Sequence, residues 1–125
     1  MINWNNMDTL ASYAALCSAE PVKLAAVMAG DSGAERVKKY SVPMGCGLDF
    51  NFGARPVNDE ILAIMADFAK EQQLVEKFAE LYNGAVINTG EKRRVLHHMC
   101  RGQLGEAVIA DGVDKREFYV GEQQK

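Results

Sequence analysis

The chain has 125 residues, of which 48% are hydrophobic and 25% are charged, so its composition is that of a folded globular protein and excludes a disordered or collagen-like chain. Its 14 lysines and arginines are outnumbered by 17 aspartates and glutamates, and the formal charge of -3 argues against a nucleic-acid-binding protein. The three cysteines, Cys17, Cys46 and Cys100, are widely spaced, which predicts free thiols in a reducing cytoplasm. No apolar run is long enough to cross a membrane, and residues 1–8 lack the features of an export signal.

Residues 1–40 are expected to form short helices. Apolar residues recur at helical spacing over residues 10–16 and again over residues 22–28. Pro21 suits the first turn of a helix, and the Gly-Asp-Ser-Gly cluster at 30–33 is typical of a turn that closes one helix and caps the next. A third short helix is predicted over residues 35–39.

The hydrophobic period changes to two over residues 42–52, which indicates extended chain. Gly45 and Gly47 interrupt this stretch, so we predict two short strands joined near these glycines. Pro43 has no N–H to donate and would confine the first strand to the edge of a sheet.

The strongest helical pattern begins after Pro56. Asn58 is a candidate N-cap, and the acidic residues 59–60 follow it where the helix dipole favours negative charge. The apolar stripe changes phase at the three polar residues 71–73, which predicts a break between two helices. The second helix would end at residues 83–84, an Asn-Gly pair typical of a left-handed C-cap.

A further helix is predicted through residues 93–100, with Asn88 or Thr89 near its N-terminus. Residues 108–110 are expected to form a strand that turns at the Asp-Gly pair 111–112. The charged stretch that follows stops at Gln124-Lys125 without a capping signal, and the chain looks truncated. The side chains expected to face the core from the predicted helix are Val95, Leu96, Met99 and Cys100.

These elements predict an α+β chain that is mainly helical, with short helices around a small two-stranded element. We expect a single segment, 1–125, with a helical lead-in over 1–40, short strands over 41–53, helices over 54–104, and a strand, a turn and a truncated end over 105–125.

Few side chains are available to bind a phosphate group or a cofactor. The chain has only four serines and two threonines, scattered singly and without a glycine-rich nucleotide fingerprint. The cluster at 30–33 is the nearest imitation of an anion site, and we interpret it as a turn. We therefore expect no cofactor.

Metal binding and cysteine catalysis also have weak support. His97 and His98 are adjacent, and only His97 and Cys100 share the i, i+3 spacing of two ligands on one helix face. Cys17 and Cys46 would complete a set only by coincidence of folding. Cys100 is expected on the core face, where a thiol is inert. We therefore expect no metal site and no catalytic cysteine.

One basic cluster is present, and its residues are Lys92, Arg93, Arg94, His98 and Arg101. Such a cluster could bind RNA or a phosphorylated ligand. Because the chain is acidic overall, we favour a solvated face or intramolecular ion pairs.

Residues 83–101 resemble a segment of the glucose-6-phosphate isomerase family. That segment reads Asn-Gly, two residues, Ile-Asn, then Thr-Glu-Gly-Arg-Ala-Val-Leu-His, with an arginine four residues after the histidine. This chain departs from it at Gly90, Lys92 and Arg94, where the family has Thr, Gly and Ala. Residues 108–114 and the pair Asp49-Phe50 are also similar to family motifs, so the resemblance covers about residues 35–125. Ten residues agree within the segment: Asn83, Gly84, Ile87, Asn88, Glu91, Arg93, Val95, Leu96, His97 and Arg101.

The resemblance implies the N-terminal part of a cytoplasmic homodimeric enzyme that interconverts glucose 6-phosphate and fructose 6-phosphate through an enediol. In the family the glutamate base, the catalytic histidine and lysine, and the phosphate-binding loop all come later in the sequence. The resemblance therefore implies that this segment is inactive alone, that it has no catalytic or substrate-binding residue, and that the ten matching residues, including His97, are structural.

The implied partners are the remainder of the isomerase chain and a second subunit, with sugar phosphate bound only by the full enzyme. Nucleic acid, membrane and metal are not expected to bind. As a separate fragment, the chain would leave an apolar face uncovered and self-associate. Two alternatives are a free-standing helical interaction module, whose gene would end near residue 125, and a weak anion or RNA binder that uses the basic cluster.

Overall fold

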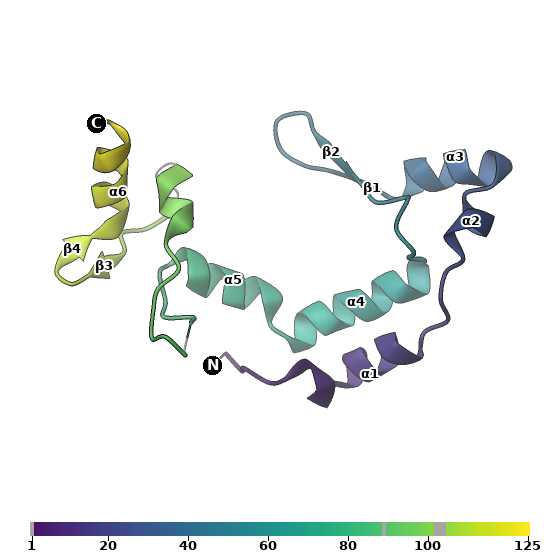
Figure 1. The fold of residues 1–125 in the computed structure, drawn as a ribbon, viewed down its shortest axis with the longest axis horizontal. Coiled ribbons are helices and arrows are strands. Elements are labelled where there is room, and N and C mark those ends of the chain that lie inside the picture. The colour runs from purple at the N-terminus through teal and green to yellow at the C-terminus, as the bar shows by residue number, and fades with distance from the viewer. Residues whose placement is uncertain (1, 89, 102–104) are drawn as a thin grey trace. The chain divides into compact units, whose positions relative to one another are not determined.

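The computed structural model describes residues 2–88, 90–101 and 105–125 (Figure 1). Their contacts divide the chain into two compact units, Asn5–Glu71 and Met1–Trp4 with Gln72–Lys125. The described residues form six α-helices and two antiparallel two-stranded sheets, which confirms the mainly helical α+β class. The prediction of one two-stranded element was incomplete, because the segment after residue 105 forms a second one.

The Asn5–Glu71 unit is built around α1 and α4, which pack along each other (Figure 1). The rings of Tyr13 and Phe68 are 6.4 Å apart, centroid to centroid, across this contact. The buried Ser12 donates from its backbone N–H to Oε2 of Glu71 at 3.0 Å, and its hydroxyl donates to the same oxygen. The helices of this unit are η1 (Met7–Thr9), α1 (Ala11–Ser18), α2 (Leu24–Val27), α3 (Gly30–Lys39) and α4 (Asp59–Glu71).

Helix α3 begins earlier than the sequence predicted. The cluster at 30–33 forms the first turn of α3, so its interpretation as a turn outside the helices was wrong. Gly30 does supply the expected left-handed conformation, with φ of +59°. Gly33 is buried against the preceding turn, where an added Cβ would lie 2.4 Å from the carbonyl oxygen of Met28. The helix can start here because glycine permits this close approach.

Arg36 of α3 fixes the loop that leads to α4. Its Nε donates to the carbonyl oxygen of Gly53 at 2.7 Å, and its Nη2 donates to the carbonyls of Arg55 and Val57 at 2.8 and 2.6 Å. The guanidinium also lies 4.5 Å from the centre of the Tyr40 ring. One side chain therefore satisfies three loop carbonyls that have no partner in regular secondary structure.

A hairpin connects α3 to this loop. Its strands are β1 (Ser41–Pro43) and β2 (Asp49–Asn51), which pair antiparallel with Val42 opposite Phe50. Cys46 and Gly47 turn the chain with positive φ angles of 59° and 73°. The two predicted strands and their junction near Gly45 and Gly47 are confirmed, and both strands are sheet edges.

Helix α4 begins and ends where the sequence predicted. The Oδ1 atom of Asn58 accepts a hydrogen bond from the backbone N–H of Ile61 at 2.8 Å, as an N-cap does. The predicted break before α5 (Leu74–Tyr82) is also confirmed, because Gln73 has a left-handed φ of 50°.

The C-terminus of α5 has the predicted left-handed cap. Gly84 has φ of +73°, the N–H of Ala85 donates to the carbonyl of Glu80 at 2.9 Å, and the N–H of Gly84 donates to that of Leu81 at 3.1 Å. This pair of bonds is a Schellman motif, which satisfies carbonyls that the helix leaves free.

The helix predicted over residues 93–100 is wrong. The segment contains only the 3-10 helix η2 (His97–Arg101), and Lys92 reverses the chain before it with φ of +54°. Met99 is fully buried, as expected, but Cys100 is exposed, and Val95 and Leu96 are half-buried. Asn88 caps a turn instead of a helix, and the alternative cap, Thr89, lies outside the described residues.

A second hairpin and an unexpected helix complete this unit. Strands β3 (Ile109–Ala110) and β4 (Val113–Asp114) meet at the predicted turn, where Asp111 and Gly112 have φ of 55° and 75°, the signs of a type I′ turn. Helix α6 (Lys115–Gln123) follows directly and packs against η2. It was not predicted because its charged sequence carries little apolar periodicity. Asp114 with Glu117 three residues later was an available N-terminal signal, and Asp114 does accept a bond from the N–H of Arg116 at 2.9 Å.

The first described residues belong to the same unit as α5. The N–H of Asn3 donates to Oε1 of Gln73 at 2.8 Å, and the ammonium of Lys77 lies 4.9 Å from the centre of the Trp4 ring. Asn3 and Trp4 therefore contact the start of α5.

Candidate functional site

The candidate site is the loop that joins α5 to η2, and its conformation depends on Asn88. The Oδ1 atom of Asn88 accepts from the N–H of Glu91 at 3.1 Å, and its Nδ2 donates to Oε2 of Glu91 at 3.3 Å. The carbonyl of Asn88 accepts from the N–H of Arg93 at 3.1 Å, and Nη1 of Arg93 lies 3.6 Å from Oε2 of Glu91. Three of the predicted motif residues thus form one closed set of polar contacts.

The loop is also attached to the C-terminus of α5. Arg94 donates from Nη1 to the carbonyl oxygen of Gly84. Nε2 of His98 lies 3.1 Å from the carbonyl oxygen of Tyr82, and the two rings stack with their centroids 4.5 Å apart. A cationic group near the last carbonyls of a helix is favourable, because the helix dipole is negative there.

Arg116 of α6 makes a third contact with the end of α5. It is only 2% exposed, and it donates from Nη2 to the carbonyl of Tyr82 and from Nε to the carbonyl of Glu106. Nη1 of Arg116 and Nδ1 of His98 are buried, and no described residue accepts from or donates to either of them. Arg116 was not predicted to be buried, because a lone arginine in a charged stretch is normally solvated.

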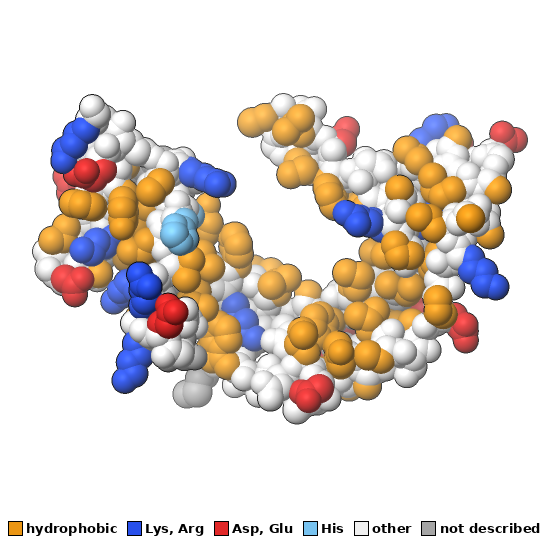
Figure 2. Space-filling view, viewed as in Figure 1, with side chains coloured by type: hydrophobic (Ala, Val, Ile, Leu, Met, Phe, Trp, Pro, Cys, Tyr) orange, Lys and Arg blue, Asp and Glu red, His pale blue; other side chains and the backbone are white. Residues whose placement is uncertain are grey.

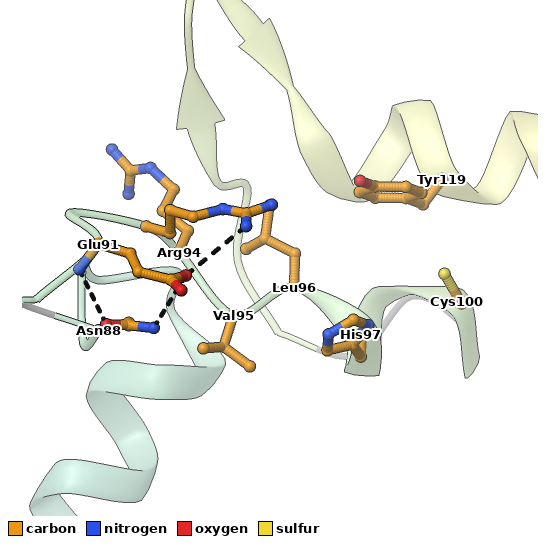
Figure 3. A pocket seen from close by; sticks show the side chains of 9 residues that line it. Asn88, Glu91, Arg94, Val95, Leu96, His97, Cys100 and Tyr119 are labelled. Atoms are coloured by element: carbon orange, nitrogen blue, oxygen red, sulfur yellow. Dashed lines mark hydrogen bonds and ion pairs between the residues drawn. The ribbon is translucent and has the colours of Figure 1, made fainter.

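A cavity of about 500 Å³ lies beside the loop (Figure 3). The dashed lines in Figure 3 join Asn88 to Glu91 and the Glu91 carboxylate to the guanidinium of Arg93, whereas none joins His97, Cys100 or Tyr119 to one another. The one carboxylate that lines the cavity is thus already hydrogen-bonded and paired. The lining residues are Asn88, Glu91, Arg93, Arg94, Val95, Leu96, His97, Cys100 and Tyr119.

The structure brings most of the predicted motif residues together. Asn88, Glu91, Arg93, Val95, Leu96 and His97 line the same cavity. Asn83 and Gly84 instead cap α5, Ile87 lies beside a smaller hollow next to Trp4, and Arg101 is exposed at the end of η2. His97 is itself exposed, so the histidine that contacts the backbone is its neighbour, His98.

No group of three histidine, cysteine or acidic side chains that could hold a metal occurs among the described residues. His97 and Cys100 both line the cavity, but Cys17 and Cys46 belong to the other unit. The exposure of Cys100 overturns the expectation that its thiol is shielded in the core.

The basic cluster is used largely within the fold. Arg93 pairs with Glu91, while Arg94 and His98 contact carbonyls at the end of α5. The expected intramolecular ion pair is confirmed for Arg93, whereas Arg94 and His98 contact backbone carbonyls instead.

Comparison with known proteins identifies the family. A sequence profile described as phosphoglucose isomerase matches residues 51–120, which include α4, α5 and the candidate loop. The chain belongs to the phosphoglucose isomerase family.

Curated relatives extend the match to the whole chain. Glucose-6-phosphate isomerase of Treponema denticola is 45% identical over 99% of this chain and 25% of its own length. The proteins of the same name from Treponema pallidum and Borreliella afzelii are 41% and 35% identical over 99% and 100% of this chain, and over 24% and 23% of their own lengths. The chain thus spans about a quarter of the length of these relatives. Within the described residues, none of the helices has the length and apolar character needed to cross a membrane.

Proposed function

We propose that this chain is the N-terminal part of a glucose-6-phosphate isomerase that interconverts glucose 6-phosphate and fructose 6-phosphate in the cytoplasm. The observation that carries the proposal is the family match over residues 51–120, which contains the Asn88, Glu91 and Arg93 arrangement. The names of the relatives, which match over the whole chain, support the same reaction.

The role that we propose for this segment is structural. The polar groups of its motif hold the loop, as the contacts of Asn88, Glu91 and Arg93 illustrate. A phosphate-binding loop needs several hydroxyls or free backbone amides close together, whereas the chain has only four serines and two threonines, scattered singly. We therefore place the catalytic and phosphate-binding groups in the remainder of the enzyme.

The proposed partners follow from this assignment. Residues 1–125 would form one N-terminal segment that packs on the remainder of the isomerase chain, within a homodimer, and only the full enzyme would bind sugar phosphate. We further propose that the ten motif residues, His97 among them, serve the structure of this segment and not the chemistry.

An isomerase assay of two proteins tests the proposal. The full-length enzyme encoded by the gene is expected to convert fructose 6-phosphate to glucose 6-phosphate, and the 125-residue chain is expected to give no rate above the buffer blank. Full-length enzyme carrying His97→Asn serves as the control for the motif, and its KM should equal that of the wild type.

Three results would contradict the proposal. Turnover by the 125-residue chain alone would place catalytic groups within it. A full-length protein without isomerase activity would refute the assigned reaction, and a gene that ends near residue 125 would favour the free-standing interaction module.

A further inference from the structure

One face of the β1–β2 hairpin is entirely apolar and exposed. Val42 and Phe50 are register partners, and the N–H of Met44 donates to the carbonyl of Leu48 at 2.7 Å, so these two pairs lie on the same side of the ribbon. Their exposed fractions are 45% and 53% for the first pair, and 57% and 64% for the second. We call these four residues the hairpin apolar face, and Figure 2 shows hydrophobic side chains gathered over this hairpin.

The opposite side of the ribbon is different in character. It carries the alternate residues, among them Pro43 opposite Asp49. It also carries Asn51, which donates from Nδ2 to the carbonyl of Val37 at 2.6 Å and accepts from the N–H of Gly53 at 3.0 Å. The polar side therefore fixes the hairpin to α3, whereas the four side chains of the apolar side stay about half exposed.

The hairpin apolar face continues into the core of its unit. The ring of Phe50 stacks on Phe52 at 5.9 Å, and Phe52 lies 5.5 Å from Tyr40, which is only 5% exposed. Phe50, Phe52 and Tyr40 thus form a row of aromatic contacts that runs from the exposed hairpin apolar face to the buried Tyr40. An isolated two-stranded hairpin is at best marginally stable in water, so this face requires a cover.

We propose that the hairpin apolar face docks on the part of the isomerase chain that lies beyond residue 125. This inference rests on the proposed function. The relatives are about four times as long as this chain, so the proposed enzyme has ample polypeptide to supply the cover. The face carries no charged side chain, so its complement is an apolar surface.

The size of the face favours a segment of the same chain over a second copy. Four side chains that are about half exposed offer on the order of 300 Å², whereas a stable interface between separate proteins buries about 800 Å² per partner. A covalently linked segment is already held at high effective concentration, so a small contact suffices.

Lysine substitutions in the full-length enzyme test the location of the contact. Leu48→Lys and Met44→Lys place a charge on the hairpin apolar face, and the matched control, Pro43→Lys, places the same charge on the opposite side, next to Asp49. We expect the two face variants to lower the thermal midpoint of the enzyme relative to the control. Equal midpoints for all three variants would overturn the docking proposal.

Cross-linking from Cys46 at the tip of the hairpin identifies the occupant. The full-length enzyme is prepared with Cys17→Ser and Cys100→Ser, and any cysteine beyond residue 125 is also replaced, so that Cys46 is the one thiol to be labelled. A photoreactive maleimide attached to Cys46 is expected to form a cross-link to a peptide beyond residue 125, in a product that has the mass of a monomer. A product of dimer mass, or cross-links confined to residues 1–125, would overturn the assignment. Isomerase activity of the unmodified enzyme is measured in parallel: its loss would refute the proposed function, whereas an active enzyme with equal midpoints would refute only the docking site.

Discussion

Arg116 donates from Nη2 to the carbonyl oxygen of Tyr82, 34 residues earlier in the chain. The bond joins α6, which the sequence analysis did not predict, to the end of α5, where the family motif begins. The same carbonyl also lies 3.1 Å from Nε2 of His98. The last turn of α5 is therefore the point at which α6, η2 and the motif loop are held together.

Replacing Arg116 with methionine should destabilise this unit. The carbonyls of Tyr82 and Glu106 would lose their donor while still buried, so we expect the free energy of unfolding in urea to fall by about 2 kcal/mol. Arg55→Met, at an exposed arginine of the other unit, is the control and should change it by less than about 0.5 kcal/mol. Equal unfolding midpoints for the two variants would contradict this interpretation of Arg116.

Alanine substitutions at Gly84 and Gly112, which have nearly the same φ, can distinguish the stability cost of backbone strain from the cost of a steric clash. Gly84 and Gly112 have φ of 73° and 75°, so alanine at either position carries a left-handed penalty of about 1 kcal/mol. Only at Gly84 would the new Cβ clash, because Cγ1 of Val108 lies 2.3 Å from its position, whereas nothing lies within 4 Å at Gly112. Urea denaturation should show Gly84→Ala to be the more destabilising by about 1–3 kcal/mol. Similar losses would mean that Val108 moves aside without cost.

The N-cap of α4 can be tested by a single truncation. Asn58→Ala removes the acceptor for the N–H of Ile61 and should lower the free energy of unfolding by about 1 kcal/mol. Asn58→Asp keeps an acceptor at the same place and should restore the stability. Hydrogen exchange at Ile61 is the local measurement, and unchanged protection in the alanine variant would disprove the cap.

The Ser12–Glu71 contact predicts a pH dependence. The hydroxyl of Ser12, and then its backbone N–H, lower the pKa of Glu71 below its ordinary value of 4.5. Because the folded-state pKa lies below that of the unfolded state, the contact stabilises the fold at neutral pH. That contribution is lost as the pH falls below 4.5 and through the lowered pKa.

Acid titration of two serine variants checks this prediction. In Ser12→Ala the loss of stability on acidification should be smaller than in the wild type, since the hydroxyl bond that favours the carboxylate is gone. Ser18→Ala, whose exposed hydroxyl donates to the carbonyl of Ala14 and to no carboxylate among the described residues, should titrate as the wild type does. If Ser12→Ala lost as much stability on acidification as the wild type does, the contact between Ser12 and Glu71 would not form in solution.

Elements set by neighbouring residues could be predicted from the sequence. The cap at Asn58, the break before α5 and the Asn83-Gly84 cap each depend on a few adjacent side chains and on one turn of backbone. The strands on either side of Gly45 and Gly47 were predictable for the same reason, because alternation and glycine position act locally.

The candidate loop could not be predicted in this way, because its form depends on contacts across several residues. The apolar spacing of Val95, Leu96 and Met99 is typical of a helix. The carbonyl of Asn88, however, accepts a hydrogen bond from the N–H of Arg93, and the chain forms a turn there instead. The family resemblance named six of the residues that line the cavity, but it did not predict their contacts. Neither the sequence pattern nor the family resemblance predicted the role of Arg116, because its burial depends on contacts with the distant end of α5.

The assignment of the first described residues to the α5 unit has a consequence for how the chain folds during translation. The stretch Asn5–Glu71 is continuous, so all of its partners have been synthesised once Glu71 emerges from the ribosome. Asn3 and Trp4 are made earlier, yet their partners Gln73 and Lys77 come after that stretch. Asn3 and Trp4 thus leave the exit tunnel before the Asn5–Glu71 stretch but can reach their native neighbours only after it has been synthesised.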